Sequence, residues 1–117
     1  MKLRVLLLSL AAAVGLTFAS VALSQSHARK TTTVIVTAKE FKFVLSTKTV
    51  KAGAVIFKIV NKGKLQHDFK ISGKKTALIA PGKSATLKVT LSKGSKPYMC
   101  TVAGHAAAGM KGALKVT

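Results

Sequence analysis

The amino-acid sequence predicts an all-β domain, a β-sandwich, behind an N-terminal targeting segment. Short runs of β-branched and aromatic residues recur along the chain, and glycine, proline and asparagine separate them at regular spacing. No helical periodicity follows the N-terminal segment. Seven or so short strands of this kind are typical of a sandwich, and 117 residues leave room for one small domain.

Residues 1–24 are expected to be a signal peptide or a membrane-anchor helix. Lys2 and Arg4 supply positive charge ahead of an apolar run over 5–23, which is the pattern of an export signal. Small residues near the end of the run offer cleavage sites, while its length keeps an uncleaved anchor as the alternative. Either outcome places the domain outside the cytoplasmic membrane, in the periplasm, the extracellular space or the cell envelope.

A flexible polar lead-in is expected over 25–32, followed by the folded domain over 33–117. His27 lies in the lead-in and is expected to be a surface residue rather than a ligand.

The first half of the domain predicts three strands. Residues 33–38 are rich in β-branched side chains, 41–45 carry apolar residues on one face, and 54–61 alternate in the same way. Turns are expected at 50–53 and 61–64, where turn-forming residues gather. The side chains expected to face the core are Phe41, Phe43, Leu45, Val55, Phe57 and Ile59.

The second half predicts three more strands and a fourth short one. A short strand is expected over 66–72, then an irregular crossing over 73–82 and a cleanly alternating strand over 84–91. The next strand, over 95–100, ends at the only cysteine, and the last covers 112–117. The residues expected to point inward from the alternating strand are Ala85, Leu87, Val89 and Leu91.

The chain is strongly basic, with 20 lysine and arginine residues against Glu40 and Asp68, a formal net charge of +18. Cleavage after Ser24 would remove two basic residues and leave +16. Alternating solvated lysines on strands explain part of this charge, and the resulting surface suits an acidic redox protein or an anionic cell-envelope surface. Nucleic acid is disfavoured, because no stacking aromatics interleave with the lysines and no nucleic-acid motif is present.

Four side chains are candidate metal ligands. Cys100, His105 and Met110 follow one another at five-residue intervals, and His67 lies upstream. Two imidazoles, one thiolate and one thioether form the ligand set of a type 1 (blue) copper site, with the methionine as a weak axial ligand. As the alternative, the cysteine and methionine fill a core and the histidines are structural or solvated. Cys100 ends a strand before a loop of small residues, and this position favours metal ligation. Ligation would also explain why an exported protein has a lone thiol.

The Cys-x4-His-x4-Met motif, with Asn61, Gly63 and His67 upstream, resembles the cupredoxins, the family of small blue-copper proteins. The spacing is similar to that of the rusticyanin-, auracyanin- and sulfocyanin-like members. The resemblance covers 33–117 and implies a Greek-key β-sandwich with one copper ion at one end. The metal ligands that it implies are His67, Cys100, His105 and Met110.

Two neighbours of these residues carry expectations of their own. Asp68 departs from the family pattern, in which many members have Asn or Ser after the first histidine. It is expected to accept a hydrogen bond from the Thr101 hydroxyl or a nearby backbone N–H and so tie the two ligand loops together. Met99 is expected to point away from the Cys100 side and Tyr98 toward it, because strand residues alternate.

The leading functional hypothesis is a monomeric one-electron carrier. Copper would alternate between Cu(II) and Cu(I), and electrons would pass through an exposed ring edge of His105 beside a patch of alanines at 106–108. Copper delivery or sequestration without a redox partner is the alternative, and a basic adhesive module without copper is a minor one. Catalysis is not expected, because four ligands leave no open position for a substrate and no other ionisable pair is available.

Overall fold

The computed structural model describes residues 11–17, 19, 20, 22 and 30–117. The prediction of a signal peptide or anchor over 1–24 therefore falls largely outside the described residues, and His27 falls outside them too. Among the residues described, none forms a helix with the length and apolar character needed to cross a membrane.

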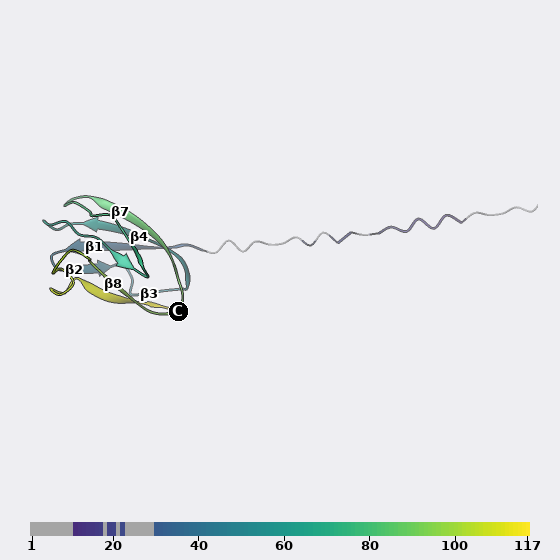
Figure 1. Cartoon of the computed structure of the whole chain (residues 1–117). Coiled ribbons are helices and arrows are strands. Elements are labelled where there is room, and N and C mark those ends of the chain that lie inside the picture. Colours follow the sequence, from purple (N-terminus) through teal and green to yellow (C-terminus); the bar gives the residue numbers. More distant parts are fainter. Residues whose placement is uncertain (1–10, 18, 21, 23–29) are drawn as a thin grey trace, which may run out of the picture.

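Two β-sheets make up the described domain (Figure 1). The first sheet has the strand order β2-β1-β4-β7, and its strands are β1 (Thr32–Lys39), β2 (Lys42–Leu45), β4 (Gly53–Asn61) and β7 (Ser84–Leu91). The second has the order β3-β9-β8-β5-β6, and its strands are β3 (Thr49–Val50), β5 (Lys70–Ile71), β6 (Lys74–Lys75), β8 (Gly94–Met99) and β9 (Lys111–Val116). This all-β architecture confirms the predicted fold class.

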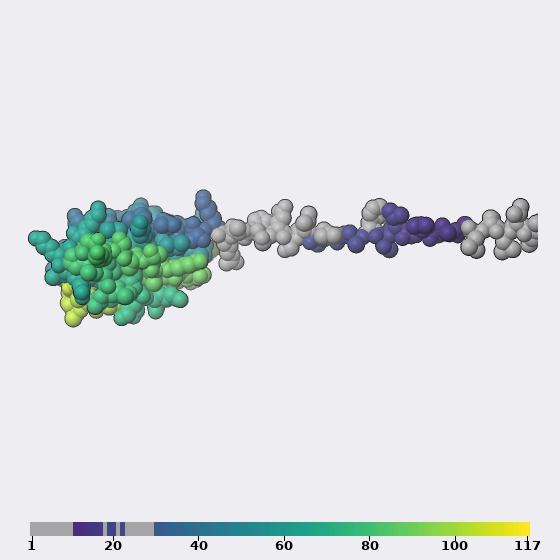
Figure 2. Space-filling view, turned by 90° about the horizontal axis from the view of Figure 1, so that it is seen from above, coloured from purple at the N-terminus to yellow at the C-terminus, as the bar shows by residue number. Residues whose placement is uncertain are grey.

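Most neighbouring strands are antiparallel, but β1 pairs with β4 and β3 pairs with β9 in parallel. The chain therefore crosses between the sheets instead of running as a simple meander. Segments far apart in the sequence consequently share one surface, as the blue β1 region and the green β7 region do in the space-filling view (Figure 2).

The core lies between the two sheets and follows the alternation of the long strands. Val55, Phe57 and Ile59 of β4 are fully buried, as are Val34 and Val36 of β1 beside them. Residues two apart on a strand share a face, so these side chains form one layer. Phe69, the residue before β5 of the second sheet, meets this layer, and its ring centroid lies 5.2 Å from that of Phe57.

The longest strands match their predicted ranges to within a residue or two, and the 84–91 strand matches fully. The predicted 66–72 strand is wrong in extent: His67 forms an isolated bridge with Ile79, and only Lys70–Ile71 form a strand. The predicted turn at 50–53 and crossing at 73–82 overlap the two-residue strands β3 and β6. Strands of two residues are too short to show a period of two.

Phe41 also corrects the prediction. It lies in the turn between β1 and β2 rather than on the inward face of a strand, and 38% of it is exposed. Phe43 and Leu45 of β2 do pack against the core, as expected.

Candidate metal centre

A single loop, between β8 and β9, carries three of the four candidate ligands. Cys100 is the residue after β8 and Met110 the residue before β9, and the Cys100 N–H donates to the Met110 carbonyl at 3.0 Å. The Met110 N–H in turn donates to the His105 carbonyl at 3.1 Å. Gly104 adopts a φ of 81°, a conformation that glycine takes most easily.

Three donor side chains converge inside the domain, next to the loop between β8 and β9. His67, Cys100 and His105 are all buried, and their donor atoms lie within 4.8 Å of one another. The Cys100 Sγ is 3.6 Å from Nδ1 of His105 and 4.0 Å from Nδ1 of His67, and the two Nδ1 atoms are 3.1 Å apart. Met110 is fully buried beside them.

These separations fit a trigonal metal site. Metal distances of about 2.0 Å to imidazole nitrogen and about 2.3 Å to thiolate sulfur place the two nitrogens of such a site roughly 3.1–3.5 Å apart. The same distances place each nitrogen roughly 3.5–4.0 Å from the sulfur. Both imidazoles direct the same atom, Nδ1, toward the sulfur. The cluster therefore fits one ion held by two nitrogens and one sulfur, and the softness of thiolate and thioether favours copper.

Burial raises the pKa of the Cys100 thiol in the metal-free domain. A thiol in this environment is held as the neutral form at neutral pH. A coordinated cation reverses this preference and removes the proton. Copper binding here is therefore coupled to proton release, which is a general property of thiolate sites.

His67 is brought to the cluster by the segment that follows β4. Its backbone pairs with Ile79, with N–O distances of 3.2 and 2.7 Å. The fully buried Asn61 side chain supports this segment, because its Nδ2 donates to the carbonyls of Leu65 and Ile79, both at 2.8 Å. Its Oδ1 accepts from the Gly63 N–H at 2.9 Å. The motif residue Asn61 thus fixes the path from β4 to His67.

Asp68 ties the two ligand-bearing segments together, as predicted. Its carboxylate accepts from the Thr101 N–H at 2.6 Å and also from the Thr101 hydroxyl. Asp68 is almost fully buried, and it neighbours His67 in sequence as Thr101 neighbours Cys100. The carboxylate therefore holds the two segments in register beside the donor atoms.

Glu40 is a second carboxylate at the centre, and sequence reasoning did not identify it. It lies in the turn between β1 and β2, and its Oε1 accepts from the N–H groups of Lys64 and Leu65 at 2.6 and 2.7 Å. The same oxygen is 3.4 Å from Nε2 of His67. The pKa of Glu40 is lowered to about 2, chiefly by the hydrogen bond from the Leu65 N–H. The N–H groups of Glu40 itself and of Lys64 and the contact with His67 lower it further.

His105 is nearer the surface than His67, although both are buried: 8% of His105 is exposed and none of His67. The ring of Phe41 stands edge-on against the His105 ring, with centroids 5.1 Å apart. Phe41 is itself partly exposed. The path from the cluster to solvent therefore runs past a narrow edge of His105 and an aromatic side chain.

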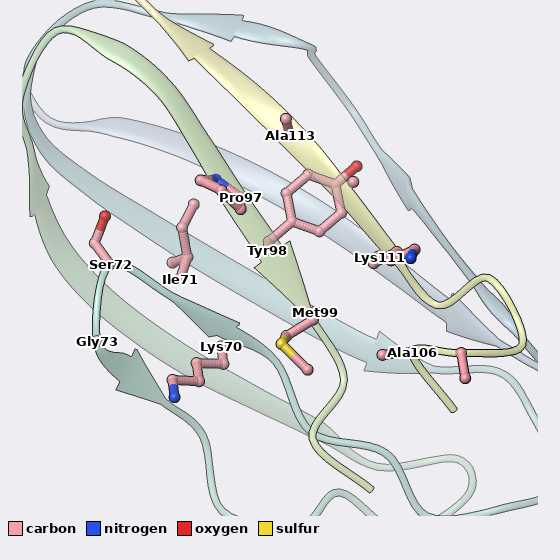
Figure 3. A pocket seen from close by; sticks show the side chains of 12 residues that line it. Lys70, Ile71, Ser72, Gly73, Pro97, Tyr98, Met99, Ala106, Lys111 and Ala113 are labelled. Carbon is pink, nitrogen blue, oxygen red and sulfur yellow. The ribbon is translucent and has the colours of Figure 1, made fainter. Parts of the chain in front are cut away.

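A groove of about 870 Å³ lies on the outer face of the second sheet, next to the ligand loop (Figure 3). Pro97 and Met99 of β8 line it, and Met99 is 39% exposed, which confirms that it points away from Cys100. Tyr98 also lines the groove, but its ring stacks on that of Phe69, which belongs to the core. The other side chains that line the groove include Lys70, Ala106, Ala107, Lys111 and Ala113.

A two-sheet sandwich that closes at one end on a buried Cys–His–His cluster with a methionine beside it defines the class of small blue-copper proteins. Comparison with models of protein families gives a more specific assignment: the model of the cupredoxin-like domain matches residues 9–114. The chain therefore belongs to the cupredoxin-like family, and its donor set fits one copper ion.

Solved structures share this fold. A dithionite-reduced auracyanin from Roseiflexus castenholzii is 20% identical, with a TM-score of 0.64 over 74% of this chain and 97% of that one. Auracyanin A, a "blue" copper protein of Chloroflexus aurantiacus, is 18% identical, with a TM-score of 0.62 over 75% and 100%. An azurin from Methylomonas sp. strain J is 18% identical, with a TM-score of 0.59 over 74% and 98%. A sequence comparison with curated proteins finds no match.

Proposed function

We propose that this chain is an exported type 1 copper protein that carries one electron at a time. His67, Cys100 and His105 would hold the ion in a trigonal plane, and Met110 would be the weak axial ligand. The bound metal would supply the Cu(II)/Cu(I) couple. The observation that supports this most is the buried cluster, in which a thiol and two imidazole nitrogens lie within 4.8 Å of one another.

The surrounding chain favours a site that changes little between oxidation states. The backbone bonds of Cys100 and Met110, the Asp68 bridge to Thr101 and the Asn61 side chain all fix the donors from outside. Ligands oriented by such contacts need little rearrangement when the charge of the ion changes. The absence of an open ligand position for a substrate is the reason for proposing no catalytic role.

The exit for electrons is proposed to be the His105 edge. The surface near the His105 edge is apolar, because Phe41 and the small alanine side chains at 106–108 form it. The groove beside Met99 extends this surface. Three lysines are sequence neighbours of this region: Lys39 and Lys42 flank the turn that carries Glu40, and Lys64 precedes Leu65. The proposed partner is therefore an acidic redox protein or an anionic envelope surface, and mutual repulsion of basic chains favours a monomer.

The export proposal rests on the sequence pattern of the N-terminal segment. Residues 1–24 are proposed to be a signal peptide or an anchor, with a lead-in over 25–32 and the copper domain over 33–117. N-terminal sequencing of the protein recovered from the cell envelope and the medium would identify a cleaved end. A protein retained in the cytoplasm with residue 1 or 2 at its N-terminus would contradict export.

The copper-loaded protein is expected to take up and release one electron reversibly in voltammetry, while the metal-free protein gives no wave. Copper should stay bound when the loaded protein is mixed with a metal-free copper acceptor. Stoichiometric transfer of copper to the acceptor, without a reversible wave, would contradict the carrier and favour copper delivery.

Electron exchange is expected to depend on salt in a direction set by the charge of the reagent. With an anionic oxidant such as hexacyanoferrate(III), the rate constant should fall about tenfold or more between about 0.01 and 0.5 M salt, because steering by a basic surface is screened. With a cationic cobalt–phenanthroline oxidant as the control, it should rise. Stopped-flow absorbance measures both, and two salt-independent rates would contradict the steering proposal.

A further inference from the structure

Glu40 meets His67 on the side of the ring that faces away from the cluster. Nδ1 of His67 points toward Cys100 and His105, while Nε2 lies 3.4 Å from Oε1 of Glu40. His67 is fully buried, so this carboxylate takes the place that water would occupy on an exposed ring. A ring nitrogen that faces an ionised carboxylate is favoured as the protonated donor.

We infer that Glu40 is a positioning residue that fixes the tautomer and orientation of His67. With the proton held on Nε2, Nδ1 is left with a free lone pair directed into the cluster. The inference rests on the proposed function, in which His67 is a copper ligand. Carboxylate–histidine pairs of this kind orient ligands and raise their basicity in metal sites.

The surroundings of Glu40 show that the carboxylate is held in this place. One oxygen accepts from two backbone N–H groups on the segment that leads to His67, so the carboxylate links the turn to that segment. Gly63 leaves room for it, because a Cβ at that position would lie 2.5 Å from Oε1 of Glu40. Even the methyl group of an alanine at position 63 would therefore push the Glu40 carboxylate away.

The charge pattern of the chain makes this placement specific. Only Glu40 and Asp68 are acidic, against 20 basic residues. Asp68 is engaged by Thr101, and among the described residues the side chain that Glu40 contacts is His67 rather than a lysine. A surface carboxylate on so basic a chain would be expected to meet lysines, and this one is turned toward an imidazole.

The same arrangement specifies where the protons lie in the copper-free protein. The two Nδ1 atoms are 3.1 Å apart, a hydrogen-bond distance in which one nitrogen donates and the other accepts. If Glu40 holds the His67 proton on Nε2, then Nδ1 of His67 accepts and His105 carries its proton on Nδ1. Neutral His67 and His105 are therefore opposite tautomers before the metal binds.

Long-range ¹H–¹⁵N correlation spectra of the copper-free protein at about pH 8 test this inference directly. Wild type should show His67 protonated on Nε2 and His105 on Nδ1. E40A should lose the single His67 tautomer, while E40Q should keep it, because the amide oxygen can still accept. G63A should disturb the tautomer with Glu40 still present. T90K is the matched control: it adds one positive charge on β7 at the end away from the cluster and should leave the spectra unchanged.

Copper affinity supplies the second readout. E40A and G63A should bind Cu(II) roughly 10–100-fold more weakly than wild type, the range for loss of an outer partner of a metal ligand. E40Q should recover most of that loss. A wild-type His67 protonated on Nδ1, or an E40A protein with an unchanged tautomer and affinity, would overturn the inference. If E40A does not fold, an unchanged His67 tautomer in G63A would overturn the inference instead. The spectra need no copper, so failure of the proposed function would appear separately, as a colourless loaded wild type.

Discussion

Replacement of Cys100 by serine is expected to remove the intense visible absorption of the copper-loaded protein. That absorption arises from charge transfer between the thiolate and Cu(II), and Cys100 is the only sulfur donor of this kind in the chain. The affinity for copper should also fall by more than the roughly 100-fold typical of outer-partner mutations, because a direct ligand is lost. The visible spectrum of the purified protein after addition of Cu(II), together with a competition titration, measures both effects.

M99L is the matched control for this variant. Met99 is the neighbour of Cys100 in sequence, but its side chain is exposed on the outer face of the sheet. Its replacement should leave the visible band unchanged. A band of wild-type intensity in C100S, or a colourless wild type, would mean that copper binds elsewhere or not at all, and the basic surface would then be the main guide to function.

Fold class and candidate ligands could both be predicted from the sequence, because each leaves a local pattern. The alternation in β4 and β7 follows from burial of one face, and it placed Phe57 and Val89 in the core correctly. The C-terminal ligand residues lie at fixed intervals in one loop, so their proximity needed no knowledge of the fold. The structure brings His67 to Cys100 and His105, which the sequence could suggest only through the family resemblance.

Contacts that depend on the tertiary fold left no such pattern. Glu40 lies 27 residues before His67, and the parallel pairing of β1 with β4 is what brings their two ends together. The one signal that pointed to Glu40 was its rarity, since it is one of two acidic residues in a basic chain. Phe41 was misplaced for a related reason: its apolar character suits a strand face, but in the fold it packs against His105 instead.

Asp68→Ala is expected to give the second large effect, this time on the stability of the copper-free protein. The Ala variant leaves the Thr101 N–H and hydroxyl without their buried acceptor. Loss of two hydrogen bonds to a charged group should lower the free energy of unfolding by roughly 2–4 kcal/mol. For a domain of this size that is a substantial part of the total. Urea unfolding followed by circular dichroism measures the change.

Asp68→Asn is the conservative comparison, because it keeps one acceptor oxygen of the same shape. It should be less destabilised than D68A, and T101V should add little further loss on top of D68A. That non-additivity is the sign that the two side chains act as one contact. An unfolding free energy of D68A within about 0.5 kcal/mol of wild type, the range of ordinary surface substitutions, would contradict the bridge.

The same variants separate stability from metal binding. Asp68 and Thr101 each neighbour a proposed ligand, so loosening their contact should let the His67 and Cys100 segments move apart. D68A should therefore release copper to a chelator faster than wild type even at temperatures where both are folded, whereas a core variant of equal instability far from the cluster should not. Equal release rates would mean that Asp68 stabilises the fold without holding the ligands in register.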